Sequence, residues 1–372
     1  MRIGVVLPVL HWQGGSQVGV TLAETWAELG NDVEILVLDP AWTPMVARPV
    51  PSVPTTFLAA TNWPSAVKRL RGRLAEREFD VVHAIGDYAS MILGLASLRL
   101  KPRPPLLIGS EHFPTSVKFG DFTHFKGRVA GVLMRYAYQH LDASICVNKD
   151  LQERLVTELG WDSKRCPVIH NPVRLDPANP DEIETERRTR RENGQPFLIA
   201  AAAALQPRKD YPTLLRAFAF ASKQLPMRLA IAGEGDELVK LQTLCFELDI
   251  TDQVEFLGAV SNIADFFRQA DVFVFSSINE AFGLVLIEAL SQGVPTVSTD
   301  GPGPSEIIAK ATYGRLVPVG DFRAMAKGIV EFCQSPPEAR VIVERAKDFA
   351  PEKLSSAYVS FFRSQLASTS DR

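Results

Sequence analysis

One stretch of the chain, residues 272–293, constrains the fold more than any other. It begins with the apolar run Val272–Phe275, which is short, rich in β-formers and preceded by the turn-forming Asp271. A polar loop follows, and Leu284–Gln292 then has the length of a helix that ends at Gly293. This strand–loop–helix order points backbone N–H groups and a positive helix end toward an anion, commonly a phosphate.

Two carboxylates in this stretch are candidate ligand-binding groups. Glu288 is the only carboxylate in an otherwise apolar helix, so we expect it to be buried and to need hydrogen-bond donors. It is either a structural Glu held by a neighbouring backbone or Arg, or a ligand-binding Glu that accepts from hydroxyls. Glu280 precedes the helix, at about 10 Å from Glu288 by helix rise and loop length. That distance is too long for a shared proton, but it suits the two ends of one long ligand.

Strand and helix patterns alternate along the rest of the chain, which predicts an α/β fold with parallel sheets. One further strand is expected at Cys166–Val173, and the amphipathic pattern of Pro351–Ala367 predicts a final helix. The other predicted strands occupy residues 1–10, 33–38, 79–85, 105–113, 142–148, 197–203, 228–233, 254–258, 272–275 and 294–300.

The length of 372 residues is large for one hydrophobic core and suits two domains. Residues 174–195 are rich in Pro, Asp, Glu and Arg and have no apolar period, which is typical of a domain boundary. We therefore predict a first domain at 1–175, a linker at 176–195 and a second domain at 196–351.

Composition excludes several classes of protein. A net charge of −3 without a basic bias argues against nucleic-acid binding. The four cysteines are widely spaced without a Cys-x-x-Cys pair, so they are interpreted as reduced core residues and not as a disulfide or zinc framework. No run of eighteen apolar residues occurs, and the N-terminus lacks a signal-peptide cleavage pattern, which predicts a cytoplasmic or membrane-peripheral protein.

Three further positions could bind a ligand, and each also has a simple structural interpretation. Gly14 and Gly15 follow the first strand, where they form either a tight turn or a close approach to a ligand. His112 ends a predicted strand, and ligands of parallel sheets bind beyond strand carboxyl ends, although a lone His is more often packed or exposed. Arg208 and Lys209 are either solvated loop charges or cations for a phosphate.

The segment Lys118–His140 combines basic residues with interleaved aromatic ones. It is interpreted either as a contact with an anionic membrane surface or as an ordinary amphipathic helix with a solvated face. No Asp-x-Asp occurs in the sequence, which gives little support to a metal-dependent enzyme.

The Glu-x7-Glu pattern within Asn279–Val297 resembles the signature of retaining glycosyltransferases of family 4. The resemblance implies the GT-B fold, in which two Rossmann-like domains face each other across a cleft, with the C-terminal helix 352–368 packed back on the first. It also implies a nucleotide-sugar donor and a glycan or lipid-linked acceptor read by the first domain. The Gly-Pro-x-Glu at Gly303–Glu306 resembles members that use UDP-hexoses or UDP-N-acetylhexosamines.

The same resemblance implies a role for each candidate residue. Glu280 would bind the donor sugar, Glu288 the ribose hydroxyls and Lys209 the donor phosphates. His112 matches a histidine that contacts the transferred sugar. The remaining donor contacts would be backbone groups, at Gly14 and Gly15 for the diphosphate and at Phe282, Gly283 and Leu284 for sugar and phosphate.

One departure from the family pattern bears on activity. The family has Gly-Arg-Leu before the phosphate-binding lysine, whereas this chain has Ala203-Ala204-Leu205. Arg208 would have to replace the missing cation, and without that replacement activity would be weakened or lost. The expected function is a retaining glycosyltransferase that uses no metal or other cofactor and builds surface polysaccharide. Two alternatives stay open: a catalytically inactive nucleotide-sugar-binding subunit, and a GT-B-fold UDP-sugar epimerase.

Overall fold

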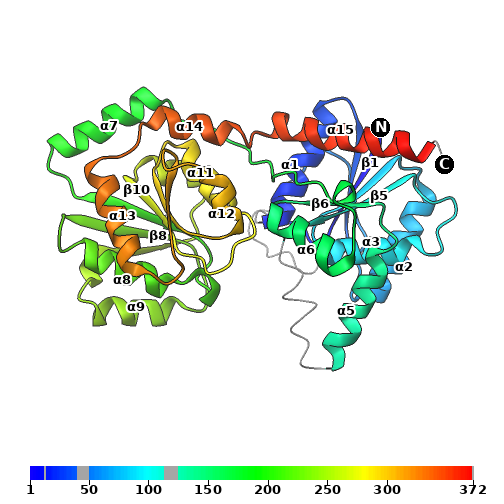
Figure 1. The fold of residues 1–372 in the computed structure, drawn as a ribbon, viewed down its shortest axis with the longest axis horizontal. Coiled ribbons are helices and arrows are strands. Elements are labelled where there is room, and N and C mark those ends of the chain that lie inside the picture. Colours follow the sequence, from blue (N-terminus) through cyan, green and yellow to red (C-terminus); the bar gives the residue numbers. More distant parts are fainter. Residues whose placement is uncertain (12–13, 40–49, 113–124, 371–372) are drawn as a thin grey trace. The chain divides into compact units, whose positions relative to one another are not determined.

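The computed structural model describes residues 1–11, 14–39, 50–112 and 125–370 (Figure 1). The chain divides into two compact units. The first unit contains Met1–Arg174 and the C-terminal segment from Pro351, and the second unit contains Leu175–Ala350.

The first unit is built on a six-stranded parallel sheet with the order β3-β2-β1-β4-β5-β6. Its strands are β1 Arg2–Leu7, β2 Asp32–Val37, β3 Thr55–Phe57, β4 Val81–Ala84, β5 Leu106–Glu111 and β6 Ala143–Cys146. Its described helices are α1 Gly14–Glu28, α2 Trp63–Glu76, α3 Asp87–Ser97, α5 Phe125–Tyr138, α6 Lys149–Leu159, the 3-10 turn η1 Ser163–Arg165, and α15 Pro351–Ser370.

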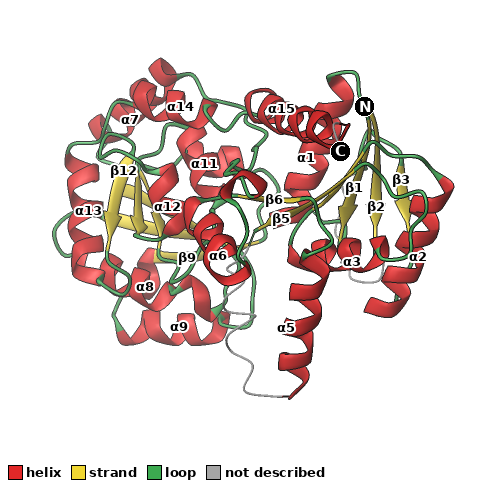
Figure 2. Ribbon diagram, turned by 45° about the vertical axis from the view of Figure 1, so that its right-hand side comes forward, coloured by secondary structure: helices red, strands yellow, loops and turns green. Residues whose placement is uncertain are grey.

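The second unit repeats this plan with the order β12-β11-β10-β7-β8-β9, and helices flank its sheet (Figure 2). Its strands are β7 Phe197–Ala202, β8 Met227–Ala232, β9 Val254–Gly258, β10 Val272–Phe275, β11 Thr296–Thr299 and β12 Gly314–Val317. Its helices are α7 Pro180–Glu192, α8 Tyr211–Ala221, α9 Leu238–Glu247, α10 Ile263–Arg268, α11 Leu284–Ser291, α12 Pro302–Ile307, α13 Phe322–Gln334 and α14 Ala339–Lys347, with 3-10 turns η2 Pro207–Lys209 and η3 Thr251–Gln253.

In both units the strand order runs 3-2-1-4-5-6 when the strands are counted along the unit, which is the Rossmann order. The central strands are buried, because β1 and β10 carry apolar side chains toward both faces. The predicted α/β class with two Rossmann-like units is confirmed. The cleft between them stays a prediction.

Close packing of helix on sheet holds each unit together. In the first unit a Cβ at Gly19 of α1 would lie 2.4 Å from the end of the Leu7 side chain of β1, so glycine lets the helix approach the strand without displacing that side chain. Helix α15 packs on α1, where Trp26 lies 5.8 Å from Tyr358 and 5.3 Å from Phe362 between ring centroids. In the second unit, α8 and α13 cover the face of β7, β8 and β10 that bears Ile199, Ile231 and Val274.

Two predicted segments differ in the structure. Residues 166–173 form no strand: Cys146 and Val168 make a single bridge, because Pro167 and Pro172 lack the N–H groups that a ladder needs. The predicted linker 176–195 contains the helix α7, which belongs to the second unit and contacts α14 (Figure 1). Ile183 is the one aliphatic residue that α7 buries, so the sequence of this helix shows no apolar period.

Candidate functional site

The loops that follow β7 and β10 are joined at the carboxyl edge of the second sheet. The Ser276 hydroxyl donates to the Lys209 carbonyl at 2.7 Å, and the Ile278 N–H donates to the Arg208 carbonyl at 2.9 Å. Asp210 is the N-cap of α8 in a left-handed conformation, and its carboxylate accepts from the Thr213 N–H. These bonds fix the backbone of the loop that carries both cations.

Lys209 and Glu280 form a close ion pair in this junction. Nζ of Lys209 lies 2.5 Å from Oε2 of Glu280, and the two side chains are 11% and 17% exposed. Nζ also lies 5.1 Å from the centroid of the Phe275 ring. Burial lowers the pKa of Lys209 from 10.5, while the Glu280 carboxylate acts in the opposite direction. The pair is a desolvated cation and carboxylate at the strand ends, where parallel sheets bind ligands.

Arg208 brings a second cation to the same carboxylate. Its Nη1 lies 3.8 Å from Oε2 of Glu280, and its Nε donates to Oε1 of Gln206 at 3.2 Å. The side chain is 43% exposed, so it can reorient at little cost. Two basic groups therefore lie at this edge despite Ala204.

The start of α11 is held by tight backbone packing. Gly283 is the N-cap residue, with a φ of 96° that disfavours other side chains. A Cβ at Gly303 would lie 2.4 Å from Phe282 Cα, and the Gly303 N–H donates to the Glu280 carbonyl at 3.2 Å. The backbone that leads into α11 is thus packed against α12 at Phe282, as a rigid anion site at Phe282, Gly283 and Leu284 requires.

Glu288 departs from the prediction. Its side chain is half-buried, because Leu284, Val285 and Glu288 share the one face of α11 that is not fully covered. A partly exposed carboxylate does not need the full set of protein donors that complete burial would demand.

The remaining predicted residues lie at the carboxyl edge of the first sheet. Gly14 begins α1 with a φ of 57°, and a Cβ on Gly15 would lie 3.5 Å from Ile85. The Ser110 hydroxyl donates to the Ala84 carbonyl at 3.0 Å and lies 3.0 Å from Nε2 of His112. Burial lowers the pKa of His112 from 6.5 to about 4, so the imidazole is neutral at pH 7.

Two other buried groups near this edge are structural. Glu111 is completely buried and accepts from the Tyr138 hydroxyl and, at 3.4 Å, from the Ser144 hydroxyl. His83 is enclosed by the rings of Trp26, Tyr358 and Phe362 at 5.7 to 5.8 Å between centroids. The sequence placed Glu111 beside His112, but the alternation of a strand turns the two side chains in opposite directions.

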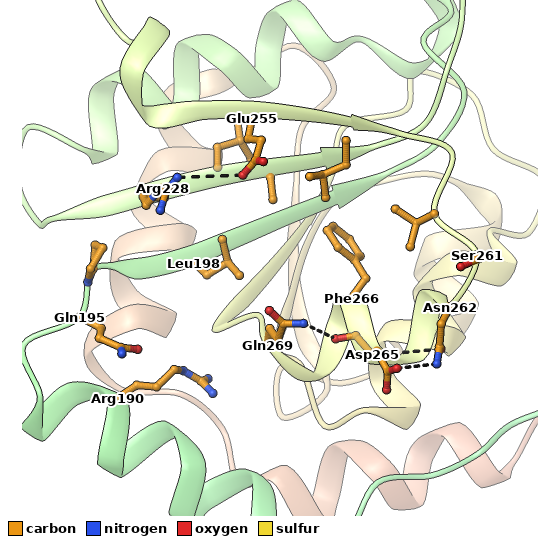
Figure 3. Close-up of a pocket in the computed structure, with 15 residues that line it drawn as sticks. Arg190, Gln195, Leu198, Arg228, Glu255, Ser261, Asn262, Asp265, Phe266 and Gln269 are labelled. Atoms are coloured by element: carbon orange, nitrogen blue, oxygen red, sulfur yellow. Dashed lines mark hydrogen bonds and ion pairs between the residues drawn. The ribbon is translucent and has the colours of Figure 1, made fainter.

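A cavity of about 790 Å³ lies elsewhere on the second unit. Figure 3 shows it beside β7, β8, β9 and α10, with Leu198, Arg228, Glu255 and Phe266 in its lining. It contains none of the predicted site residues. Because its four charged lining residues cancel in sign and it holds no close cation–carboxylate pair of the kind that Lys209 and Glu280 form, we assign the functional site to the edge that carries those two residues.

Within the part of the chain that the structure describes, no helix is long and apolar enough to cross a membrane. The same described ranges hold no group of three or more His, Cys, Asp or Glu side chains placed to bind a metal ion. Residues 118–124 of the predicted membrane-contacting segment lie outside the described residues, and its helical part is α5.

The sequence reasoning missed several residues that shape these two edges. Phe275 and Ser276 bind the lysine loop, Ser110 orients His112, and Gly303 fits against the backbone before α11. Their residue types are common, so only the small-residue run Gly301–Pro304 carried any local signal.

Comparisons with known proteins agree with this architecture. A family model described as Glycosyltransferase Family 4 matches residues 12–177, and one described as Glycosyl transferases group 1 matches residues 182–349. Among solved structures, Anabaena HepE in complex with UDP superposes with a TM-score of 0.80 at 18% identity, over 98% of this chain and 100% of that one. The fold is therefore GT-B.

Three curated relatives span large parts of the chain. EpsD of Bacillus subtilis (strain 168), assigned provisionally as a glycosyltransferase, is 32% identical over 76% of this chain and 75% of its own. The phosphatidyl-myo-inositol mannosyltransferase of Mycobacterium leprae (strain TN) is 29% identical over 89% of this chain and 87% of its own. The lipopolysaccharide core biosynthesis glycosyltransferase LpsE of Rhizobium meliloti (strain 1021) is 26% identical over 61% of this chain and 66% of its own. With both halves matched by these models and these relatives, the chain belongs to glycosyltransferase family 4 and is a glycosyltransferase.

Proposed function

We propose that this enzyme transfers a hexose or N-acetylhexosamine from a UDP-sugar to a glycan or lipid-linked acceptor, with retention of anomeric configuration and without a metal ion. The observation that carries the proposal is the buried contact of Lys209 with Glu280 beside the clamped start of α11. It places a cation, a carboxylate and helix N–H groups together at a strand edge, which is what a charged sugar donor requires.

Each group at this edge has a part in the proposed reaction. Lys209, Arg208 and the N-terminal N–H groups of α11 offset the charge that develops on the departing diphosphate. Glu280 accepts from hydroxyls of the donor sugar, and Glu288 accepts from the ribose hydroxyls. Transfer then proceeds on one face of the sugar, where the departing phosphate takes the acceptor proton, so that no protein nucleophile takes part.

The first unit supplies the other proposed contacts. His112 is neutral at pH 7 and hydrogen-bonded to Ser110, so its ring can donate to or accept from a sugar hydroxyl according to its tautomer. Gly14 and Gly15 offer backbone that can approach the diphosphate closely. Acceptor recognition also belongs to this unit under the proposal.

The choice of UDP is supported by HepE, which has been solved with UDP and with UDP-glucose. A thermal-shift screen of UDP-, GDP- and ADP-sugars tests the choice, because a bound donor raises the Tm as its concentration exceeds its Kd. A rise with UDP-sugars alone is expected. A rise restricted to GDP- or ADP-sugars would contradict the nucleotide assignment.

A surface glycan is the proposed product. Two relatives support it: LpsE is named for lipopolysaccharide core biosynthesis, and the Mycobacterium leprae relative is named as a mannosyltransferase of phosphatidyl-myo-inositol. Release of UDP with a panel of glycan and lipid acceptors measures turnover, and NMR of the product reports anomeric retention. Activity that survives EDTA is expected, since the proposed cations are side chains. An inverted product, or activity abolished by EDTA and restored by Mg²⁺, would refute the corresponding part of the proposal.

Ala204 keeps a second candidate, an inactive nucleotide-sugar-binding subunit, in view. The approach of Arg208 to Glu280 favours an active enzyme, since it supplies a second cation. Donor binding without UDP release across the whole panel would favour the subunit. A UDP-sugar epimerase would instead interconvert sugars with the donor alone.

We further propose that the enzyme acts in the cytoplasm and at the inner face of the cell membrane, through the segment Lys118–His140. In the described part of that segment, Val132 and Tyr136 are exposed near Arg135. Co-sedimentation with anionic vesicles at low salt is expected. Absence from the pellet under that condition would dismiss the membrane contact.

A further inference from the structure

One buried arginine of the second unit forms no ion pair with an acidic side chain among the residues that the structure describes. Arg187 of α7 is 2% exposed, and its Nη2 donates to the Gly293 carbonyl at 2.9 Å. Its Nε and Nη1 have no hydrogen-bond partner among the residues that the structure describes. A buried guanidinium left this incomplete is costly, so its position calls for a reason beyond packing.

The nearby carboxylates already have other partners. Asp271 accepts from the Leu198 N–H at 2.9 Å and from Nη2 of Arg190 at 3.2 Å. Glu184 accepts from the Ala339 N–H at 3.0 Å. Burial lowers the pKa of Arg187, with Asp271 and Glu184 acting in the opposite direction. An arginine stays protonated at neutral pH, so a positive charge without a direct ion-pair partner among the described residues lies at this point.

That point is the carboxyl end of α11, the helix whose opposite end forms the proposed phosphate site. Gly293 follows the helix with a φ of 66°, and a Cβ there would lie 2.7 Å from Ile183. The same segment that carries Arg187 binds this end twice more, through Ala178 N–H to the Ser291 carbonyl at 3.0 Å and Gln292 Nε2 to the Asp176 carbonyl at 2.7 Å. Residues 176–187 thus hold the helix end in place.

The charge changes what the helix presents to an anion. The last carbonyls of a helix carry about half a negative charge, which opposes anion binding at the other end. Arg187 places a positive charge on the Gly293 carbonyl, just beyond those carbonyls, and so offsets that negative pole. Eight residues of helix measure about 12 Å, a distance over which a buried charge is still felt.

We infer that Arg187 is a positioning residue for the donor diphosphate, acting through α11 by holding its carboxyl end and by offsetting the negative charge there. The inference rests on the proposed function, because it requires the diphosphate to bind at the other end of the helix. Its specific consequence is that Arg187 strengthens binding of the phosphates and not of the nucleoside.

The test compares UDP with uridine in competition calorimetry for the wild type, Arg187→Met and Arg187→Lys. In Arg187→Met the Kd for UDP is expected to rise about five-fold while the Kd for uridine stays unchanged, because the lost charge acts on the phosphates. Arg187→Lys keeps the charge and is expected to stay within about two-fold of the wild type for UDP. Arg188→Met, an exposed neighbour on the same helix, is the matched control and leaves both constants unchanged.

Other results would overturn either the role of Arg187 or the proposed function on which it rests. Equal losses of UDP and uridine affinity, or an unchanged UDP constant in Arg187→Met, would overturn the inference. Arg187→Gln is a second neutral variant that can still donate to the Gly293 carbonyl, and loss of folding in both neutral variants would assign Arg187 a purely structural role. A wild type that binds no nucleoside diphosphate would instead remove the proposed function itself.

Discussion

Lys209 is held by contacts from three directions. Its backbone carbonyl accepts from Ser276, its ammonium group contacts Glu280, and the same group lies over the Phe275 ring. Burial lowers the pKa of Lys209 and so disfavours its charged form, whereas the Glu280 carboxylate acts in the opposite direction and favours that form. A lysine kept charged in a desolvated position interacts more strongly with a phosphate than an exposed one, since the local dielectric is low.

Replacing this lysine tests its role in the reaction. We expect Lys209→Ala to lower kcat by about 100-fold, because a preorganised cation at a developing negative charge contributes on that scale. Steady-state UDP release measures the change. Lys223→Ala, at an exposed position of the same unit, is the control. A kcat within two-fold of the wild type would remove Lys209 from the reaction.

Glu288 should act on binding and not on the chemical step. Loss of a charged acceptor for two ribose hydroxyls in Glu288→Gln is expected to raise the Kd for UDP about ten-fold, with little change in kcat. Calorimetric titration with UDP measures the constant, and Glu247→Gln on exposed α9 surface is the control. Unchanged UDP affinity would show that Glu288 does not contact the nucleotide.

At the scale of elements, the site depends on how α11 begins. Gly283 supplies the left-handed turn before the helix, and α12 approaches the loop so closely that Gly303 has no room for a side chain. Both glycines shape backbone and contribute no chemistry of their own. The proposed anion site is therefore a product of helix packing, which makes it sensitive to a single added methyl group.

Gly303→Ala tests this dependence. The new Cβ would meet the Phe282 backbone at 2.4 Å, so the loop before α11 must shift, at a cost of roughly 1–3 kcal/mol in folding stability. UDP affinity is expected to fall together with the Tm. Gly72→Ala in α2 meets nothing within 4 Å and should raise stability by up to about 1 kcal/mol. A Gly303→Ala enzyme with normal Tm and UDP affinity would contradict the packing argument.

At the scale of the whole molecule, the two units share one topology but are stabilised by different cores. The first unit is closed by its own C-terminal helix, whose Tyr358 and Phe362 pack on Trp26 and around His83. Burial lowers the pKa of His83 to about 3, with His112 contributing in the same direction. Neither ring nitrogen of His83 has a partner among the described residues.

This histidine predicts acid sensitivity of the first unit. Its pKa is lower in the folded state than the ordinary 6.5, so the unfolded chain binds the proton and stability falls as pH drops from 6.5 toward 3. At pH 5 the loss is about 2 kcal/mol. The Tm of wild type and His83→Phe at pH 7 and pH 5 measures it, and a smaller difference is expected in the variant. Equal shifts in both proteins would disprove the assignment to His83.

Much of the architecture was predictable from local pattern. The strands at 254–258 and 272–275 were predicted with their observed bounds, because each is a short run rich in β-formers; β10 is buried, whereas β9 is a partly exposed edge strand. Residues 166–173 and 176–195 were predicted wrongly. Prolines removed the ladder donors from the first, and the second is a polar helix whose few contacts lie far away in sequence.

The sequence by itself determined the alternation of strands and helices, the two parallel sheets and the identity of the acidic and basic residues near strand ends. Those features depend on periodicity, which is local. Only the tertiary structure decided which of these groups meet: Arg208 reaches Glu280, Glu111 is enclosed beside Tyr138, and Arg187 lies at the far end of α11. Such pairings depend on the path of loops between distant segments, and no local pattern encodes that path.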